Sequence, residues 1–228
     1  MEEMKQYDKT SGSVAGHLTA ACSKMEQAAA LVWNTDWISP GLDEQASPAL
    51  PSINQERGEM RRIAAVVDDI YEDLELWYPR IRMEEGWKVV VAGPESGKLY
   101  TGKHGYPCRT DAAFADLRAA EFDALLVPGG FAPDKMRRDQ RLLALVRDMH
   151  AAGKLIGFIC HAGWVLISAG ILRGKRATST VGIRDDMVNA GALWVDEPLV
   201  VDGNLVSSRT PADLPFFAKG MVDWLARR

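Results

Sequence analysis

The chain is poor in cysteine and histidine. Its 228 residues include three cysteines, Cys22, Cys108 and Cys160, and four histidines. The odd number of cysteines and the lack of a C-x-x-C pair argue against a disulfide framework and against a zinc knuckle. No H-E-x-x-H or similar histidine cluster is present, so we expect no metal site and no cofactor of that kind.

Long apolar runs and blocks of one charge are also missing. No apolar run approaches the length that crosses a bilayer, and the opening MEEMKQYDKT lacks the basic-then-apolar layout of a secretory signal. The 27 basic and 31 acidic residues are well mixed, with a net charge of -4 and no basic stripe. We therefore expect a cytoplasmic protein that binds neither membranes nor nucleic acid.

Residues 1–62 differ in composition from the rest and are interpreted as an N-terminal extension. Val14–Trp33 is rich in alanine and predicts one amphipathic helix, whereas Asp36–Ser52 is rich in proline and serine and reads as a tether. Two hypotheses stay open for this segment. Trp33 and Trp37 dock on the domain or on a neighbouring subunit, or the segment is a loosely ordered tail.

Residues 63–228 alternate short apolar runs with amphipathic stretches, which is typical of β-α-β units around a mostly parallel sheet. The runs rich in β-branched residues predict four strands, over 63–67, 87–93, 123–130 and 155–160. The helical patterns between and after them cover 73–85, 141–152, 164–172 and 211–227, and Asp202-Gly203 predicts a hairpin within 199–209. We expect a three-layer α/β/α fold.

Three polar features follow predicted strands. The first strand leads into Asp68–Glu72, the third into Gly129-Gly130, and the fourth into Cys160-His161. Ligands of open parallel sheets bind where the carboxyl ends of the strands meet. If these strands are neighbours, a carboxylate, a glycine-rich loop and a thiol share one crevice.

The thiol of Cys160 supports two interpretations. At a strand-to-helix turn, the helix dipole would lower the pKa of the thiol and make it a nucleophile, although Phe158 and Ala162 occupy the glycine positions of a G-x-S-x-G elbow. Alternatively, a lone cysteine in an apolar strand is an inert core residue. In the first case, the N–H groups of Gly130 and His161 are suited to stabilise an oxyanion, and a protonated Glu72 would hydrogen-bond to the sulfur.

The residues after Arg62 resemble a known family. The resemblance rests on YEDLELWYPRIRMEEGWKV, YTGKHGYP, EFDALLVPGGFAPD, ICHAGW, LISAGILRGKRATS, GIRDDMVNAGALWVD and VVDGNLVSSRTPADLPFF, which occur in the family's order. The chain is similar to the PfpI family of intracellular proteases, within the ThiJ/PfpI superfamily. The resemblance implies a flavodoxin-like three-layer α/β/α sandwich, preceded here by the extension.

The resemblance also implies roles for individual residues. Cys160 matches the nucleophile, His161 its base, and Glu72 the carboxylic acid that contacts the sulfur, while Gly130 and His161 match the oxyanion hole. Members form dimers and higher homo-oligomers, in which an acidic residue of the neighbouring subunit orients the histidine. Asp134 stands at that position and is one methylene shorter than the family's glutamate.

Other positions depart from the family pattern. The C-H-G-P turn reads Cys160-His161-Ala162-Gly163, Trp164 follows where glutamine is common, and Thr180 replaces a tyrosine. We expect Trp164, Thr180 and Gly129 to line the substrate pocket, so peptide specificity is not carried over from the family.

Three hypotheses of function follow. The first is a cysteine hydrolase of peptides or similar acyl substrates, acting through a thioester on Cys160. The second is a stress-response glyoxalase or deglycase that acts on methylglyoxal or on its adducts with proteins. The third is a redox sensor or chaperone in which Cys160 is oxidised and not turned over.

Overall fold

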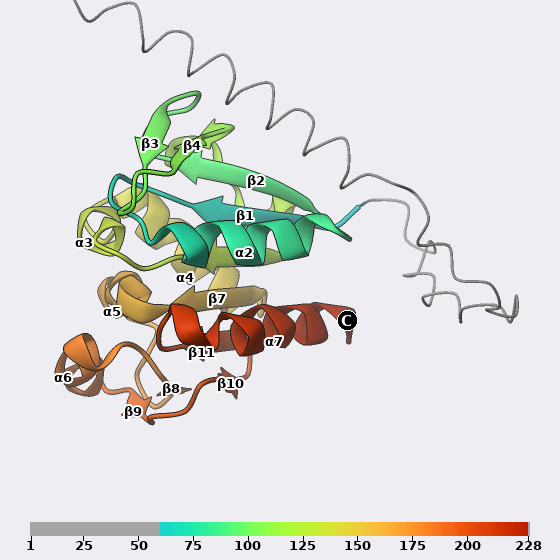
Figure 1. Ribbon diagram of the computed structural model, residues 1–228. Coiled ribbons are helices and arrows are strands. Elements are labelled where there is room, and N and C mark those ends of the chain that lie inside the picture. The colour runs from blue at the N-terminus through green and yellow to red at the C-terminus, as the bar shows by residue number, and fades with distance from the viewer. Residues whose placement is uncertain (1–59, 228) are drawn as a thin grey trace, which may run out of the picture. The chain divides into compact units, whose positions relative to one another are not determined.

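The computed structural model of the protein describes residues 60–227 (Figure 1). The predicted helix over Val14–Trp33 and the predicted tether lie outside the described residues, as does all of the extension except its last three residues. Of these, Arg62 is already the first residue of strand β1.

A seven-stranded sheet forms the centre of the domain, in the order β10-β11-β7-β6-β1-β2-β5. All neighbouring strands run parallel except β10 and β11, which form an antiparallel hairpin. The strands are β1 (Arg62–Val66), β2 (Lys88–Gly93), β5 (Ala112–Ala113), β6 (Ala124–Val127), β7 (Leu155–Ile159), β10 (Val200–Asp202) and β11 (Leu205–Ser208). The prediction of a mostly parallel sheet is confirmed.

The three central strands are buried on both faces. Every residue of β6 and β7 is buried, and in β1 only Arg62 is partly exposed. This explains why these runs are apolar throughout and do not alternate. Two small sheets lie outside the main one and were not predicted. They pair β3 (Leu99–Thr101) with β4 (Pro107–Arg109), and β8 (Arg176–Ala177) with β9 (Leu193–Trp194).

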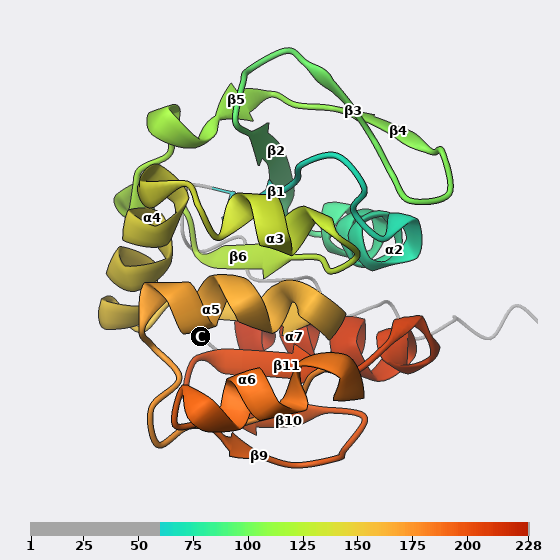
Figure 2. The ribbon, with the colours of Figure 1, turned by 90° about the vertical axis from the view of Figure 1, so that its left-hand side faces the viewer.

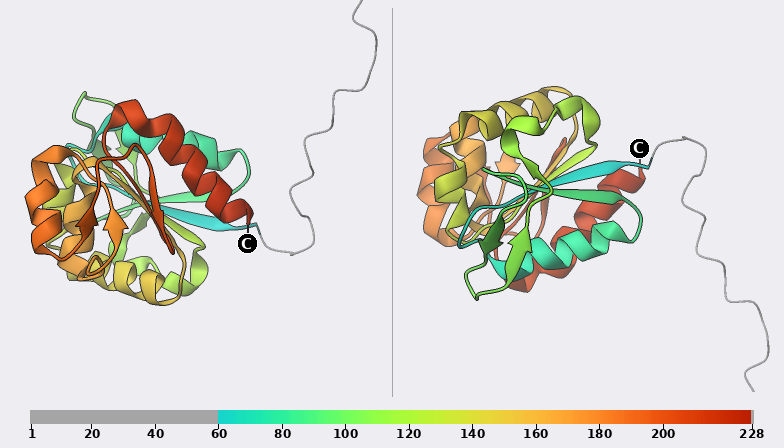
Figure 3. Two further views of the ribbon diagram at one scale, coloured as in Figure 1. Left: turned by 90° about the horizontal axis from the view of Figure 1, so that it is seen from below. Right: turned by 90° about the horizontal axis from the view of Figure 1, so that it is seen from above.

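Helices cover both faces of the sheet (Figures 2 and 3). Helices α2 (Asp73–Glu84) and α7 (Leu214–Ala226) pack against each other on one face, and α4 (Gln140–Ala151) packs on the other. The shorter helices α3 (Ala132–Met136) and α5 (Gly163–Ala169) follow β6 and β7 and contact each other, and α6 (Arg184–Asn189) packs on α5. The domain is thus the predicted three-layer α/β/α sandwich.

Several short turns of 3-10 helix complete the domain. They cover Phe114–Asp116, Ala119–Glu121, Cys160–Ala162, Val181–Ile183 and Pro211–Asp213.

Two predicted boundaries shift for local reasons. Helix α5 ends at Ala169 and not at Leu172, because Gly170 has a φ of 76° and caps the helix in the left-handed conformation. In the hairpin, Asp202 pairs with Leu205, so the two-residue turn is Gly203-Asn204 and not Asp202-Gly203. Within residues 60–227, no helix is both long and apolar enough to cross a membrane.

Candidate active site

The loops after β1 and β6 meet at the carboxyl edge of the sheet. The chain proceeds from β1 to β2 on one side and later returns to β6 on the other side of β1, so the strand order reverses there, which is where ligands bind in open parallel sheets. An isolated bridge pairs Tyr71 with Gly130, and the N–H of Glu72 donates to the carbonyl of Gly129 at 3.1 Å. Figure 2 views this edge of the sheet. The predicted meeting of the three polar features is confirmed, since β1, β6 and β7 are neighbours.

Cys160 occupies a strained turn directly after β7. Its φ is 61°, a left-handed conformation that Ile70 alone shares among the described residues other than glycine. This conformation costs a residue with a side chain about 1 kcal/mol or more. The carbonyl of Cys160 accepts a hydrogen bond from the N–H of Thr180 at 3.4 Å, which helps to hold the turn. The turn presents the side chain at the sheet edge, as a nucleophile elbow does, without that motif's glycine spacing.

Gly129 allows the groups of the site to approach one another. A Cβ at this position would lie 2.6 Å from Oε2 of Glu75, 2.7 Å from Cβ of Cys160 and 3.0 Å from the nitrogen of His161. Any side chain here would therefore push the thiol away from the carboxyl group. Gly129 is buried under Cys160, and its contacts are with these groups.

Glu75 is the buried carboxyl group of the site. Its side chain has no exposed surface, and Oε2 accepts a hydrogen bond from the N–H of Gly129 at 2.8 Å. Burial, together with the nearby Glu72 carboxylate, raises the pKa of Glu75 to about 8. The carboxyl group of Glu75 lies close enough to Cys160 for each group to shift the pKa of the other, and at neutral pH it is mainly protonated. Its second oxygen, Oε1, is buried without a hydrogen-bond partner among the described residues.

The sulfur contact that was predicted for Glu72 therefore belongs to Glu75. Glu72 precedes the first turn of α2 as its N-cap residue, and its carboxylate pairs with Nζ of Lys103 at 3.2 Å and lies 3.4 Å from Nε2 of His104. Glu75 lies one turn further along, on the side of α2 that faces the sheet. The helical period, and not the distance from the strand end, decides which glutamate points toward Cys160.

The pKa of Cys160 is raised to about 12, contrary to the predicted lowering. Burial is the main cause, and the Glu75 carboxylate adds to it, while hydrogen bonds from the N–H groups of Gly130 and His161 act in the opposite direction. Helix α5 has only seven residues, so its dipole is small against the cost of burying a thiolate. The N–H groups of Gly130 and His161 are near enough to lower the pKa of this thiol, and their role as an oxyanion hole stays a prediction. The resting thiol is protonated and needs a base.

His161 is placed to be that base. Its Nδ1 lies 3.2 Å from Sγ of Cys160. The ring lies between two aromatic side chains, with centroid distances of 6.2 Å to Phe131 and 5.1 Å to Trp164. Burial and the charge of Lys103 lower the pKa of His161, so the imidazole is neutral near pH 7 and can accept a proton.

Asp134 does not reach His161 within one protomer. It lies in the short helix α3 and forms an ion pair with Arg138. No hydrogen bond among residues 60–227 joins it to the imidazole. The prediction that Asp134 acts on the histidine of a neighbouring subunit stays a prediction.

Trp164 and Thr180 flank the site on its open side. Nε1 of Trp164 donates to Asp186 of α6 at 2.7 Å, which fixes the indole beside His161. Thr180 lines a separate cavity of about 280 Å³ that lies next to the site. Both residues are thus near the reacting groups, and their role in a substrate pocket stays a prediction.

One group of side chains, Glu72, Asp73 and His104, offers three potential metal ligands within 4.8 Å of one another. The carboxylate of Asp73 already accepts hydrogen bonds from the N–H groups of His104 and Tyr106, at 2.8 and 2.9 Å. Glu72 is paired with Lys103. These contacts anchor the loop between β3 and β4 against α2, and they account for the cluster without an ion.

Comparison with known proteins adds a family to this geometry. A family model described as the DJ-1/PfpI family matches residues 61–223. "Deglycase PfpI" of Pyrococcus furiosus is 50% identical over 156 residues, which cover 68% of this chain and 93% of the relative. "Protein/nucleic acid deglycase 2" of Escherichia coli is 41% identical over 160 residues, which cover 69% of this chain and 93% of the relative.

Solved structures agree with the fold. The crystal structure of Drosophila melanogaster DJ-1beta superposes with a TM-score of 0.70 at 28% identity, over 75% of this chain and 92% of that chain. The matched regions take in the strands and helices that carry Glu75, Gly129 and Cys160, whereas the family model begins only at residue 61.

Proposed function

This chain belongs to the DJ-1/PfpI family, and on that basis we propose that it is a deglycase, which removes dicarbonyl adducts such as those of methylglyoxal from amino or thiol groups. The observation that carries the proposal is the arrangement around Sγ of Cys160. The sulfur lies 3.2 Å from Nδ1 of His161 and beside the protonated Glu75, and the N–H groups of Gly130 and His161 act on its pKa. The relatives named deglycases support it.

The first step forms a carbon–sulfur bond. The bound adduct first expels its amine or thiol, which takes the hydroxyl proton of the adduct carbon, and this leaves the dicarbonyl beside Sγ of Cys160 while the carrier peptide is still in the site. His161 takes the thiol proton of Cys160, and the thiolate adds to the aldehyde carbon of the dicarbonyl. The N–H groups of Gly130 and His161 stabilise the oxyanion that forms, and the imidazolium then protonates it to give a hemithioacetal. The protonated carboxyl of Glu75 faces the thiolate without charge repulsion.

The second step isomerises the bound carbons. Neutral His161 removes the proton from the carbon attached to sulfur, and the imidazolium returns that proton to the neighbouring carbon, formerly the ketone. The product is a lactoyl thioester, so one carbon is oxidised, its neighbour is reduced, and no external oxidant is needed. Water then hydrolyses the thioester and releases lactate and the free thiol.

The deglycase is the second of the three hypotheses of function. The names of these two relatives favour it over the peptide hydrolase that the family resemblance first suggested. Both reactions end in hydrolysis of a thioester on Cys160. They differ in the isomerisation step, which only a substrate with two adjacent carbonyl carbons requires. Oxidation of Cys160 as a sensor uses the same sulfur without turnover.

Self-association is the second part of the proposal. A homodimer or larger homo-oligomer would bring Asp134 of one subunit to His161 of the next and hold the imidazole for its two proton transfers. Exposed apolar side chains near the site support this, because Phe131 is 57% exposed and Val181 is 75% exposed. The free thiols of Cys108 and Cys160 fit the expected cytoplasmic location.

One comparison tests the proposed activity. Wild type and Cys160→Ala are incubated with a methylglyoxal-treated peptide, with a panel of fluorogenic peptides and with peroxide. We expect lactate and free peptide from the adduct with wild type only. Peptide cleavage by wild type alone would support the hydrolase instead, and formation of sulfinate without any turnover would support the sensor.

A further inference from the structure

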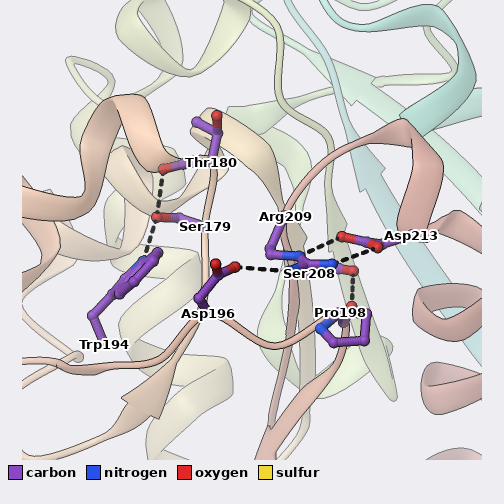
Figure 4. A network of polar contacts seen from close by, with 8 residues as sticks. All are labelled: Ser179, Thr180, Trp194, Asp196, Pro198, Ser208, Arg209 and Asp213. Carbon is purple, nitrogen blue, oxygen red and sulfur yellow. Dashed lines mark hydrogen bonds and ion pairs between the residues drawn. The ribbon is translucent and has the colours of Figure 1, made fainter.

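A polar cavity of about 280 Å³ lies beside the catalytic residues and has no part in the mechanism above. Figure 4 shows the polar network in its wall. Its lining residues are Ser179, Thr180, Val181, Trp194, Asp196, Arg209, Thr210, Ala212 and Asp213. They come from the segment after β8, from β9 and the loop that follows it, and from the loop before α7.

The cavity adjoins the reacting groups through one short segment, Thr180–Gly182. At one end of this segment the N–H of Thr180 donates to the carbonyl of Cys160 at 3.4 Å. At the other end, a Cβ on Gly182 would lie 3.8 Å from Nε2 of His161. Thr180 and Val181 themselves line the cavity. The cavity thus lies one short segment away from Cys160 and His161.

The charges of the cavity leave one carboxylate without a full partner. Arg209 binds the buried Asp213 through two hydrogen bonds, of 2.8 and 3.1 Å, and these occupy both carboxylate oxygens. Nη1 of Arg209 also donates to Oδ1 of Asp196 at 2.7 Å. One guanidinium thus serves two carboxylates. The side chain of Asp196 is 68% exposed, and one negative charge remains because a single guanidinium faces two carboxylates.

An aromatic ring adds to this preference for a cation. Trp194 is fixed by the bond from its Nε1 to Ser179 Oγ at 3.0 Å (Figure 4). Cζ of Arg184 lies 5.6 Å from the centroid of one ring, so the indole already holds a guanidinium. A carboxylate next to an indole is the combination that binds ammonium and guanidinium groups.

We propose that this cavity is a subsite for a positively charged side chain that flanks the adduct in a peptide or protein substrate. The inference rests on the proposed function, and it names the substrate class. Nucleotides and other anionic molecules that bear the adduct are disfavoured, because the Asp196 carboxylate would repel their phosphate groups. The carbons of the dicarbonyl, which react, are bound outside this cavity, at Cys160 and His161.

Matched peptides test the subsite. Each is a short acetylated peptide amide with one cysteine that carries the methylglyoxal hemithioacetal, and with either trimethyllysine or norleucine at a neighbouring position. Trimethyllysine keeps its charge and does not react with methylglyoxal. The measured quantity is the ratio of kcat/KM for the two peptides, with the hemithioacetal of a cysteinyl nucleotide conjugate as a third substrate. A calorimetric titration with the unreactive serine analogues measures binding alone.

For wild type we expect the trimethyllysine peptide to be preferred about fivefold, both in turnover and in binding. Asp196→Asn should bring the ratio close to one. The neighbouring Glu197→Gln is the matched control, since Glu197 pairs with Arg176 outside the cavity, and it should keep the wild-type ratio. Thermal unfolding of each variant checks that it is folded.

Failure of the subsite and failure of the proposed function give different results. Turnover of all peptides without a charge preference, or an unchanged preference in Asp196→Asn, overturns the subsite and leaves the deglycase proposal intact. A preference for the nucleotide conjugate also overturns it. Selective binding of the trimethyllysine analogue without turnover of any adduct supports the cation site and contradicts the deglycase proposal.

Discussion

Glu75 and Cys160 both lie against Gly129, where a Cβ would come within 2.6 Å of Oε2 of Glu75 and 2.7 Å of Cβ of Cys160. Neither group ionises easily there, because burial raises the pKa of both. Loss of the proton from one group therefore changes the pKa of the other, so the two groups titrate as a coupled pair. The chemistry of Cys160 depends on this neighbour and on the neutral imidazole of His161.

Replacing Glu75 should change the pH dependence of Cys160. The Glu75 carboxylate contributes to the raised pKa of the thiol, so Glu75→Gln should move the pH profile of iodoacetamide alkylation at Cys160 to lower pH, by about one unit. Peptide mass spectrometry gives the rate at each pH. Glu72→Gln is the control, because Glu72 is bound to Lys103, and it should shift the profile much less. An equal shift in both variants would contradict the assignment of Glu75.

The raised pKa of Glu75 also predicts how stability changes with pH. The folded protein keeps this proton up to about pH 8, whereas the unfolded chain loses it near its ordinary value of 4.5. The folded state therefore binds more protons over this range, and the contribution of Glu75 to the free energy of unfolding falls as pH rises through it. The full effect is on the order of 5 kcal/mol, at about 1.4 kcal/mol for each pKa unit. Urea unfolding between about pH 5 and pH 8.5 should show this loss in wild type and not in Glu75→Gln. A parallel pH dependence in the two proteins would contradict the prediction.

Adding one methyl group at Gly129 should disrupt the site. The new Cβ would lie within 2.7 Å of both Glu75 and Cys160, so Gly129→Ala should lower the free energy of unfolding and separate the thiol from the carboxyl group. We expect a loss of about 2 kcal/mol, typical of overpacking, together with loss of turnover. Gly182→Ala serves as the control for stability, since its Cβ would have a normal contact at 3.8 Å. An active, fully stable Gly129→Ala protein would show that the close approach is unimportant.

The proposed role of Asp134 depends on oligomers. Light scattering after gel filtration should detect a dimer or larger species, and Asp134→Ala should lower kcat about tenfold or more with little change in KM. Asp185→Asn is a suitable control, because Asp185 is an acid with 92% of its side chain exposed. A monomer with full activity, or equal effects of the two substitutions, would remove Asp134 from the mechanism.

The fold could be predicted from the sequence because it follows from local patterns, whereas the choice of Cys160 as nucleophile rests on the family resemblance and stays a prediction. Unbroken apolar runs such as Leu155–Ile159 can be stable only as strands covered on both faces, and the polar residues after them must then meet at one edge. The strand-end pattern could not show which glutamate lies beside Cys160, because Glu72 and Glu75 both follow β1. A signal was present, since Glu75 shares the buried face of α2 with Leu76, Pro79 and Met83.

Other features depend on distant parts of the chain and give no local signal. The pKa of Cys160 is set by burial and by Glu75, which lies 85 residues earlier in the chain. The cavity beside the site needs Asp196 and Arg209 to meet across a hairpin, with Trp194 held by Ser179. Helix α2 carries acidic residues inward and Leu74 and Ile81 outward, a reversal that amphipathic patterning does not predict.

The central claim is that Cys160 carries the substrate carbons as a lactoyl thioester. The most direct test is to mix wild type with the methylglyoxal adduct of a peptide, quench within a turnover, and treat one half of the sample with hydroxylamine before peptide mapping. We expect the added mass of methylglyoxal on the Cys160 peptide, with its release as a hydroxamate in the treated half, and neither signal in Cys160→Ala. Lactate formed at the wild-type rate by Cys160→Ala, or an adduct on another residue during turnover, would contradict the account.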